Sequence, residues 1–128
     1  MRFYFIRHGQ SSNNALFAST GSFDGRHEDP ELTDLGRDQA ARLGQFLAQP
    51  GTVYPDRARD EQNLAGFGIT HLYCSLMVRA VATGTIVGRA LDLPLVGWPE
   101  AHELGGIHLR DPDTGDAVGL PGHNRAYF

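Results

Sequence analysis

The sequence predicts an α/β sandwich with a mainly parallel sheet. Apolar runs typical of strands alternate with segments of helical periodicity, in the order strand, loop, helix, strand, helix, strand. The first apolar run shows no polar alternation, as in strands that are buried on both faces. The chain has 128 residues, of which 41% are hydrophobic and 20% charged, and this suffices for one compact domain with a core.

The first predicted strand covers residues 2–6, which read Arg-Phe-Tyr-Phe-Ile. Gly9 ends this strand, and the polar residues 11–14 are typical of a turn or a helix cap. We interpret residues 17–30, which are rich in Ser, Thr, Gly, Asp and His, as a long loop. Loops of this length inside a compact domain usually have a function.

The first predicted helix begins after Thr33, which is a suitable N-cap, and Pro50 and Gly51 close it. Its apolar residues fall on one stripe at helical spacing: Leu35, Ala40, Leu43, Phe46 and Leu47.

Three shorter elements follow the first helix. Residues 69–74 are predicted as a strand, residues 79–91 as a helix that Pro94 ends, and residues 95–98 as a short third strand. From Gly105 onward no periodicity indicates a further element.

Composition excludes several classes of function. The formal charge of -4 argues against a nucleic-acid partner held by a broad basic surface. Cys74 is the single cysteine, so the sequence predicts no intramolecular disulfide, and the scattered histidines favour no metal site and no cofactor. No apolar stretch is long enough to span a membrane, and Arg7 and His8 interrupt the first one too early for a signal peptide. We therefore expect a cytoplasmic protein.

Residues suited to a phosphate group follow two of the predicted strands. Ligands of parallel sheets bind outside the carboxyl ends of the strands. Arg7 and His8 lie at that end of the first strand, and Ser75 and Arg79 follow the second. The two arginines offer forked donors to an anion, and neutral donors are expected from Ser75, from Asn14 and from free backbone N–H groups of the turn after residue 9.

His8 is the candidate nucleophile of this site. The imidazole of histidine has an ordinary pKa of about 6.5, and a neutral ring nitrogen attacks phosphorus. Gly9 removes a side chain where the substrate approaches, and Glu103 is the candidate general acid for the leaving group. A histidine after a strand is more often a structural residue, so these residues alone leave both interpretations open.

Five sequence blocks between residue 2 and about residue 106 resemble the histidine phosphatase superfamily, in the order of that family. The opening block is Arg7-His8-Gly9-Gln10-Ser11 followed by Asn14. The other four blocks are Thr20-Gly21, Leu32-Thr33-x-x-Gly36 with Gln39-Ala40, Ser75-x-x-x-Arg79-Ala80-x-x-Thr83, and His102-Glu103-x-Gly105-Gly106.

The resemblance implies a three-layer α/β/α sandwich of the phosphoglycerate mutase-like kind (branch 1), formed by residues 1–128 as a single domain. It implies that His8 is the phosphorylated nucleophile and that Glu103 is the acid/base residue. The residues that it implies for phosphate and substrate binding are Arg7, Asn14, Thr20, Gly21, Ser75 and Arg79.

One part of the family pattern has no counterpart in this sequence. The family carries a second active-site histidine, followed by Gly, on a strand that lies between the first and second strands. Here His123 stands in a turn-like segment before Asn124, and His71 begins a strand at the wrong end. We interpret the chain as an N-terminal fragment, incomplete at its C-terminus. Because the strand is missing, we expect either that a second copy supplies it in a homo-oligomer, or that the sheet is rearranged, or that a longer polypeptide exists.

Three functions follow from the resemblance. Hydrolysis of a small-molecule phosphomonoester is favoured, because mutases commonly carry Trp where this chain has Asn13 and an Arg/Tyr-rich segment after the residue matched by Glu103. The second function is a phosphoglycerate mutase-type isomerisation. The third is phosphate binding without turnover by an incomplete site.

Overall fold

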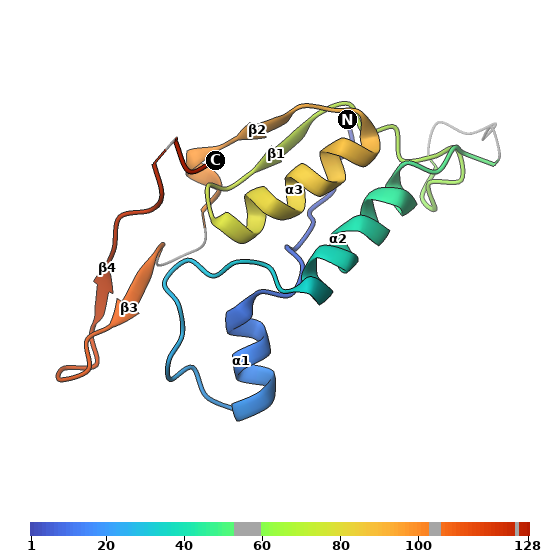
Figure 1. Cartoon of the computed structure of the whole chain (residues 1–128). Coiled ribbons are helices and arrows are strands. Elements are labelled where there is room, and N and C mark those ends of the chain that lie inside the picture. Colours follow the sequence, from blue (N-terminus) through green and yellow to red (C-terminus); the bar gives the residue numbers. More distant parts are fainter. Residues whose placement is uncertain (53–59, 103–105, 125) are drawn as a thin grey trace.

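The computed structural model describes residues 1–52, 60–102, 106–124 and 126–128 (Figure 1). The described residues include three α-helices, one short 3₁₀-helix and four short strands. In chain order they are α1 (Ser12–Thr20), α2 (Asp34–Leu47), β1 (Leu72–Cys74), α3 (Val78–Leu91), β2 (Leu95–Gly97), η1 (Pro99–Ala101), β3 (His108–Arg110) and β4 (Ala117–Gly119).

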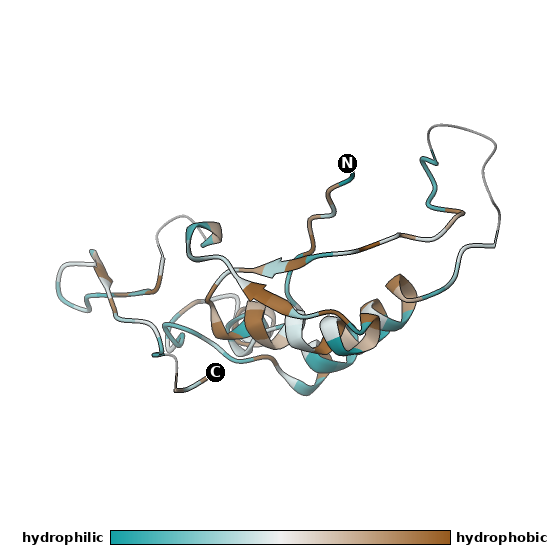
Figure 2. Ribbon diagram, turned by 90° about the horizontal axis from the view of Figure 1, so that it is seen from above, coloured by the Kyte–Doolittle hydropathy of each residue, from teal (hydrophilic) through white to brown (hydrophobic). Residues whose placement is uncertain are grey.

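The centre of the fold is a parallel strand pair covered by α3, with α2 packed against α3. β1 pairs with β2 in parallel, with Leu72 opposite Leu95, and α3 connects the two strands. α3 packs against both strands, and α2 packs against α3 (Figures 1 and 2). Leu72 and Leu95 reach α3 where Gly88 and Gly84 leave room for them. The prediction of an α/β fold with parallel strands is therefore confirmed at this level.

Small residues let α2 and α3 approach closely. Ala40 is buried, and a Cβ added to Gly44 would lie only 2.8 Å from the Cβ of Ala90 on α3. The predicted helix and its Thr33 N-cap are confirmed, since the Thr33 side chain accepts a hydrogen bond from the Gly36 N–H. The predicted apolar stripe of this helix is only partly correct.

The side chains that α2 buries differ from those predicted. Its buried residues are Gly36, Ala40, Gly44 and Leu47. Leu35 and Phe46 are 52% and 53% exposed, because the contact with α3 runs along the small residues and leaves these two large side chains beside it.

Helix α1 occupies part of the predicted loop. Ser11 is its N-cap and forms a capping box with Asn14, as the polar run there suggested. The helix continues to Thr20 and ends at Gly21, whose φ of 71° is the left-handed conformation that glycine adopts readily. The loop prediction is therefore wrong for residues 17–20.

Residues 2–6 form no strand, so the prediction of a buried first strand is wrong. Phe3 and Phe5 are 76% and 98% exposed. The Tyr4 hydroxyl instead donates to Asn63 Oδ1 at 2.6 Å, and its ring meets that of Phe67 edge-on. A strand needs a neighbour with which to exchange backbone hydrogen bonds, and none of the described strands pairs with this segment.

The three-layer sandwich is accordingly not observed in the described residues. The two helices that pack together, α2 and α3, lie on one side of the β1–β2 pair. The other face of the pair carries Tyr73 and Val96, and both are exposed.

An antiparallel hairpin near the C-terminus was missed from the sequence. β3 pairs with β4, with Leu109 opposite Val118. The Asp111 carboxylate accepts hydrogen bonds from the backbone N–H groups of Asp113 and Thr114, which closes the turn. These hydrogen bonds lower the pKa of Asp111.

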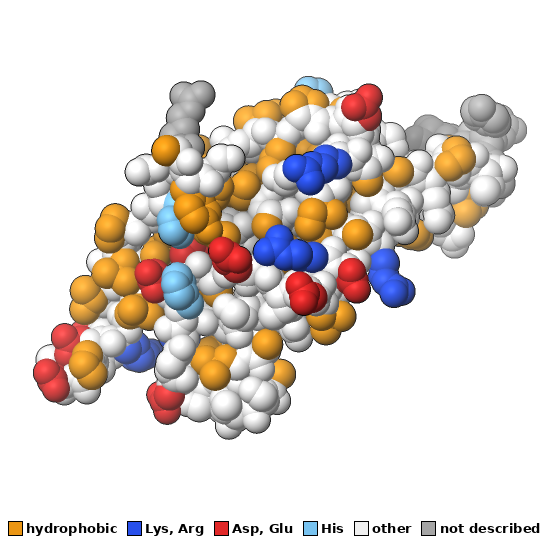
Figure 3. Space-filling model, viewed as in Figure 1, with side chains coloured by type: hydrophobic (Ala, Val, Ile, Leu, Met, Phe, Trp, Pro, Cys, Tyr) orange, Lys and Arg blue, Asp and Glu red, His pale blue; other side chains and the backbone are white. Residues whose placement is uncertain are grey.

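The surface carries charges of both signs. On the face shown in Figure 3, arginines over the helices are interspersed with acidic side chains. No described helix combines the length and the apolar character that a membrane crossing requires.

Candidate active site

The segment that carries His8 is held by its backbone between the three α-helices. The N–H groups of four consecutive residues, from Gly9 to Ser12, are all hydrogen-bonded. Their acceptors are Thr83 Oγ1 (3.2 Å), Gln39 Oε1 (2.8 Å), Asn14 Oδ1 (3.0 Å) and the Glu31 carbonyl (2.9 Å). The prediction that this turn offers free N–H groups to a phosphate is therefore wrong for these four groups.

Gly9 is required by backbone packing. It is buried, and an added Cβ would collide with the carbonyl of Gly36 at the start of α2. A Cβ on Gly36 would likewise collide with the carbonyl of Gln10. The sequence-based explanation, close approach of the substrate, is replaced by close approach of two backbone segments.

The hydrogen bonds of the His8 ring define its tautomer. Nδ1 lies 2.6 Å from the Gly9 carbonyl oxygen, which only accepts, so Nδ1 carries a proton. The Arg79 Nε–H, which only donates, lies 3.0 Å from Nε2, so Nε2 presents its lone pair. The ring is thus a neutral imidazole whose Nε2 is the basic and nucleophilic atom.

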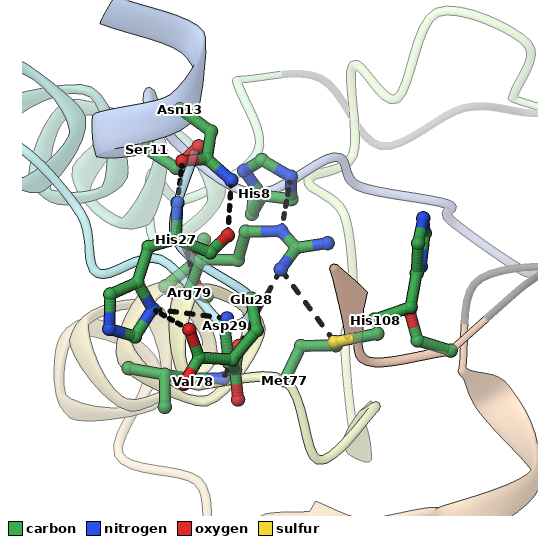
Figure 4. Close-up of polar contacts among 12 residues, drawn as sticks. His8, Ser11, Asn13, His27, Glu28, Asp29, Met77, Val78, Arg79 and His108 are labelled. Carbon is green, nitrogen blue, oxygen red and sulfur yellow. Dashed lines mark hydrogen bonds and ion pairs between the residues drawn. The ribbon is translucent and has the colours of Figure 1, made fainter. Parts of the chain in front are cut away.

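Arg79 lies in the first turn of α3 and is almost entirely buried. Its side chain extends between His8 on one side and Asp29 and Met77 on the other (Figure 4). Nη1 lies 3.6 Å from Asp29 Oδ1 and 3.6 Å from the Met77 sulfur. The expected proximity of His8 and Arg79 is confirmed, whereas Asp29 is a neighbour that sequence reasoning missed.

Helix α3 holds the His8 segment at a second point. Thr83 lies one turn after Arg79, donates its hydroxyl to the Arg79 carbonyl at 2.8 Å, and accepts the Gly9 N–H. The sequence signal for this contact was the four-residue spacing of Arg79 and Thr83 within one block, which places both on the same face of a helix.

The loop between α1 and α2 is fastened by Asn13. Its side-chain amide donates to the His27 carbonyl at 2.7 Å, and its Oδ1 accepts the His27 N–H at 2.9 Å. These two bonds fix the backbone two residues before Asp29. No sequence signal distinguished Asn13 from the other polar residues of the cap.

The other predicted site residues take no part in the contact between His8 and Arg79, although Arg7 lines a cavity together with His8. Arg7 is exposed and makes no hydrogen bond or ion pair with the described residues. Ser75 is half-buried after β1, and Asn14 turns its Oδ1 to Ser11. Glu103 lies outside the described residues.

Thr20 and Gly21 lie at the far end of α1 from His8. The Thr20 hydroxyl donates to the Leu16 carbonyl at 2.8 Å and accepts the Ser22 N–H at 3.1 Å, so it closes the helix end. An α-helix rises about 1.5 Å per residue, which separates the two ends of α1 by about 12 Å. Contact of these two residues with substrate stays a prediction.

A cavity of about 220 Å³ borders His8. It is lined by residues 7–9, by Gln39, Ala40 and Leu43 of α2, and by Thr83. Arg79 is not part of its lining.

These contacts define an α/β protein in which a part-buried histidine presents a neutral imidazole to a buried arginine. Residues 3–54, which include the His8 segment, α1 and α2, match the family model of the histidine phosphatase superfamily (branch 1). No solved structure matches the chain.

Proposed function

We propose that the protein hydrolyses small-molecule phosphomonoesters through a phosphohistidine formed on His8 Nε2. The observation that carries this proposal is the His8–Arg79 contact. It joins a neutral imidazole, with its lone pair on Nε2, to a guanidinium that a phosphoryl group would engage.

The first displacement forms the Nε2–phosphorus bond and breaks the bond from phosphorus to the ester oxygen. Before this step, the substrate phosphate takes over the Arg79 N–H that Nε2 now accepts, which releases the lone pair for attack. The leaving alkoxide takes a proton, and Glu103 is the residue we propose for this donation. Arg79 neutralises part of the charge on the phosphoryl oxygens.

The second displacement transfers the phosphoryl group to water. Water attacks phosphorus, the Nε2–phosphorus bond breaks, and the water proton passes to the base form of the same carboxylate. The products are inorganic phosphate and the regenerated neutral His8. Arg7, Asn14 and Ser75 are proposed as further phosphate ligands, and Thr20 and Gly21 as contacts to the rest of the substrate.

Product analysis separates hydrolysis from the two alternatives. Incubation with 3-phosphoglycerate, and separately with p-nitrophenyl phosphate, is expected to release inorganic phosphate. Formation of 2-phosphoglycerate without net phosphate release would establish the mutase-type activity instead. Binding of inorganic phosphate with no product from either ester would establish phosphate binding without turnover.

A further inference from the structure

We propose that Asp29 is a positioning residue that holds the Arg79 guanidinium with its Nε–H directed at His8 Nε2. The catalytic consequence of this role rests on the proposed function. The geometric part, the orientation of Arg79 toward His8, stands independently of it.

Asp29 reaches Arg79 from the loop between α1 and α2. The side chains of Arg79 and Asp29 are only 9% and 2% exposed, and Arg79 Nη1 lies 3.6 Å from Asp29 Oδ1. Figure 4 shows Arg79 between this carboxylate and the His8 ring. The two charges are therefore shielded from water. In such surroundings an ion pair is much stronger than at the protein surface.

The negative charge of Asp29 is not needed to cap the helix. Oδ1 accepts the Val78 N–H at 3.0 Å at the start of α3, and a neutral amide oxygen of the same shape would also accept it. Oδ2 is buried without a hydrogen-bond partner. Burying a carboxylate in this way is costly unless a cation compensates it, and Arg79 is the cation beside it.

Two contacts fix the plane of the guanidinium. The group is rigid and planar, so holding Nη1 near Asp29 and Nε near His8 leaves little freedom of rotation. Asp29 is itself held in place, because its N–H donates to His27 Nδ1 at 3.2 Å and Asn13 fixes the His27 backbone. The loop therefore sets the direction in which Arg79 points.

Asp29→Asn removes the charge and keeps the acceptor for Val78. The matched control is Glu31→Gln, which removes the charge of the Glu31–Arg37 pair. That pair also spans 3.6 Å but is exposed on both sides. Asp29→Ser, which retains an oxygen acceptor for the helix N-terminus, replaces the amide variant if the latter does not fold. Thermal melting establishes folding for each variant.

Two readouts test the proposal. Nitrogen NMR of the His8 ring is expected to show a shifted Nε2 resonance in Asp29→Asn and an unchanged one in Glu31→Gln. With p-nitrophenyl phosphate, kcat/KM is expected to fall about 10- to 100-fold in Asp29→Asn and to be unchanged in Glu31→Gln.

The outcomes separate the two proposals. An Nε2 resonance unchanged by Asp29→Asn overturns the positioning role, whatever the activity. A wild-type protein without turnover overturns the proposed hydrolysis, while a shifted Nε2 resonance in the variant still supports the positioning of Arg79. If the wild type is active and the folded Asp29→Asn variant has the same kcat/KM, then the positioning of Arg79 by Asp29 does not contribute to catalysis.

Discussion

Arg79 donates its Nε–H to His8 Nε2 over 3.0 Å, although the two residues lie 71 positions apart in the sequence. The first turn of α3 supplies the arginine, and the N-terminal segment fastened between the helices supplies the histidine. The Gly9 carbonyl fixes the proton on the other ring nitrogen. This pair, in a chain whose residues 3–54 match the superfamily's model, is the basis of the proposed phosphohistidine chemistry.

Arg79→Lys is expected to lower kcat/KM for p-nitrophenyl phosphate about 100-fold, because lysine keeps the charge but not the rigid forked donor. Arg89→Lys on the same helix is the control, since Arg89 is exposed near the last turn. Steady-state kinetics of both variants measure the effect. Equal values of kcat/KM for the two variants would show that the reaction does not use the forked N–H donors of the Arg79 guanidinium.

Gly9→Ala is expected to lower the free energy of unfolding by about 1–3 kcal/mol, because its methyl group collides with the Gly36 carbonyl. Gly119→Ala in β4 is the control, since a Cβ there meets nothing within 4 Å. Urea unfolding measures both. If the Gly9→Ala protein were as stable as Gly119→Ala, the backbone around Gly9 and that around Gly36 could move apart without loss of stability.

Asn13→Ala is expected to cost about 1–3 kcal/mol of stability, because the two part-buried hydrogen bonds between the Asn13 side chain and the His27 backbone are lost. Ser19→Ala, which removes an exposed hydroxyl from the same helix, is expected to change stability by less than about 0.5 kcal/mol. Thermal melting compares the two. Similar melting temperatures would contradict the role of Asn13 in holding the loop between α1 and α2.

Cys74 is expected to react slowly with iodoacetamide near pH 8. Partial burial raises the pKa of its thiol, so less thiolate is present than on free cysteine at the same pH. The stabilisation linked to this shift is present below the ordinary thiol pKa and is lost as the pH rises through that of the folded thiol.

Alkylation rates measured across pH test this prediction, since Cys74 is the only thiol. The rate is expected to rise only at higher pH than for free cysteine, and urea is expected to restore the ordinary profile. A folded protein that follows the profile of free cysteine would contradict the prediction.

Local signals in the sequence predicted the helices and the central contact. Thr33 before a periodic segment located the start of α2, and the run from Arg79 to Leu91 located α3 within one residue of its observed start. Because functional side chains follow the carboxyl ends of strands, His8 and Arg79 were predicted to lie in one site. They do lie in contact, although residues 2–6 form no strand. The family resemblance is confirmed over residues 3–54.

Features that depend on distant partners were not predictable. The apolar run of residues 2–6 indicates a tendency to be buried, but a strand also requires a neighbouring strand. The roles of Gly9 and Asp29 depend on Gly36 and Arg79, which only the folded chain brings near them. The hairpin at Asp111 did carry a local signal, the turn sequence Asp-Pro-Asp-Thr-Gly, which outweighed the absence of periodicity.

The most direct test of the proposed chemistry is phosphorylation of His8. Protein incubated with radiolabelled phosphoglycerate and quenched in base is expected to carry a label that is stable in base and lost in acid. The label is expected to be absent in His8→Ala and retained in His71→Ala, which replaces an exposed histidine beside β1. A wild-type protein without this label, or a label that persists in His8→Ala, would contradict a phosphohistidine at His8.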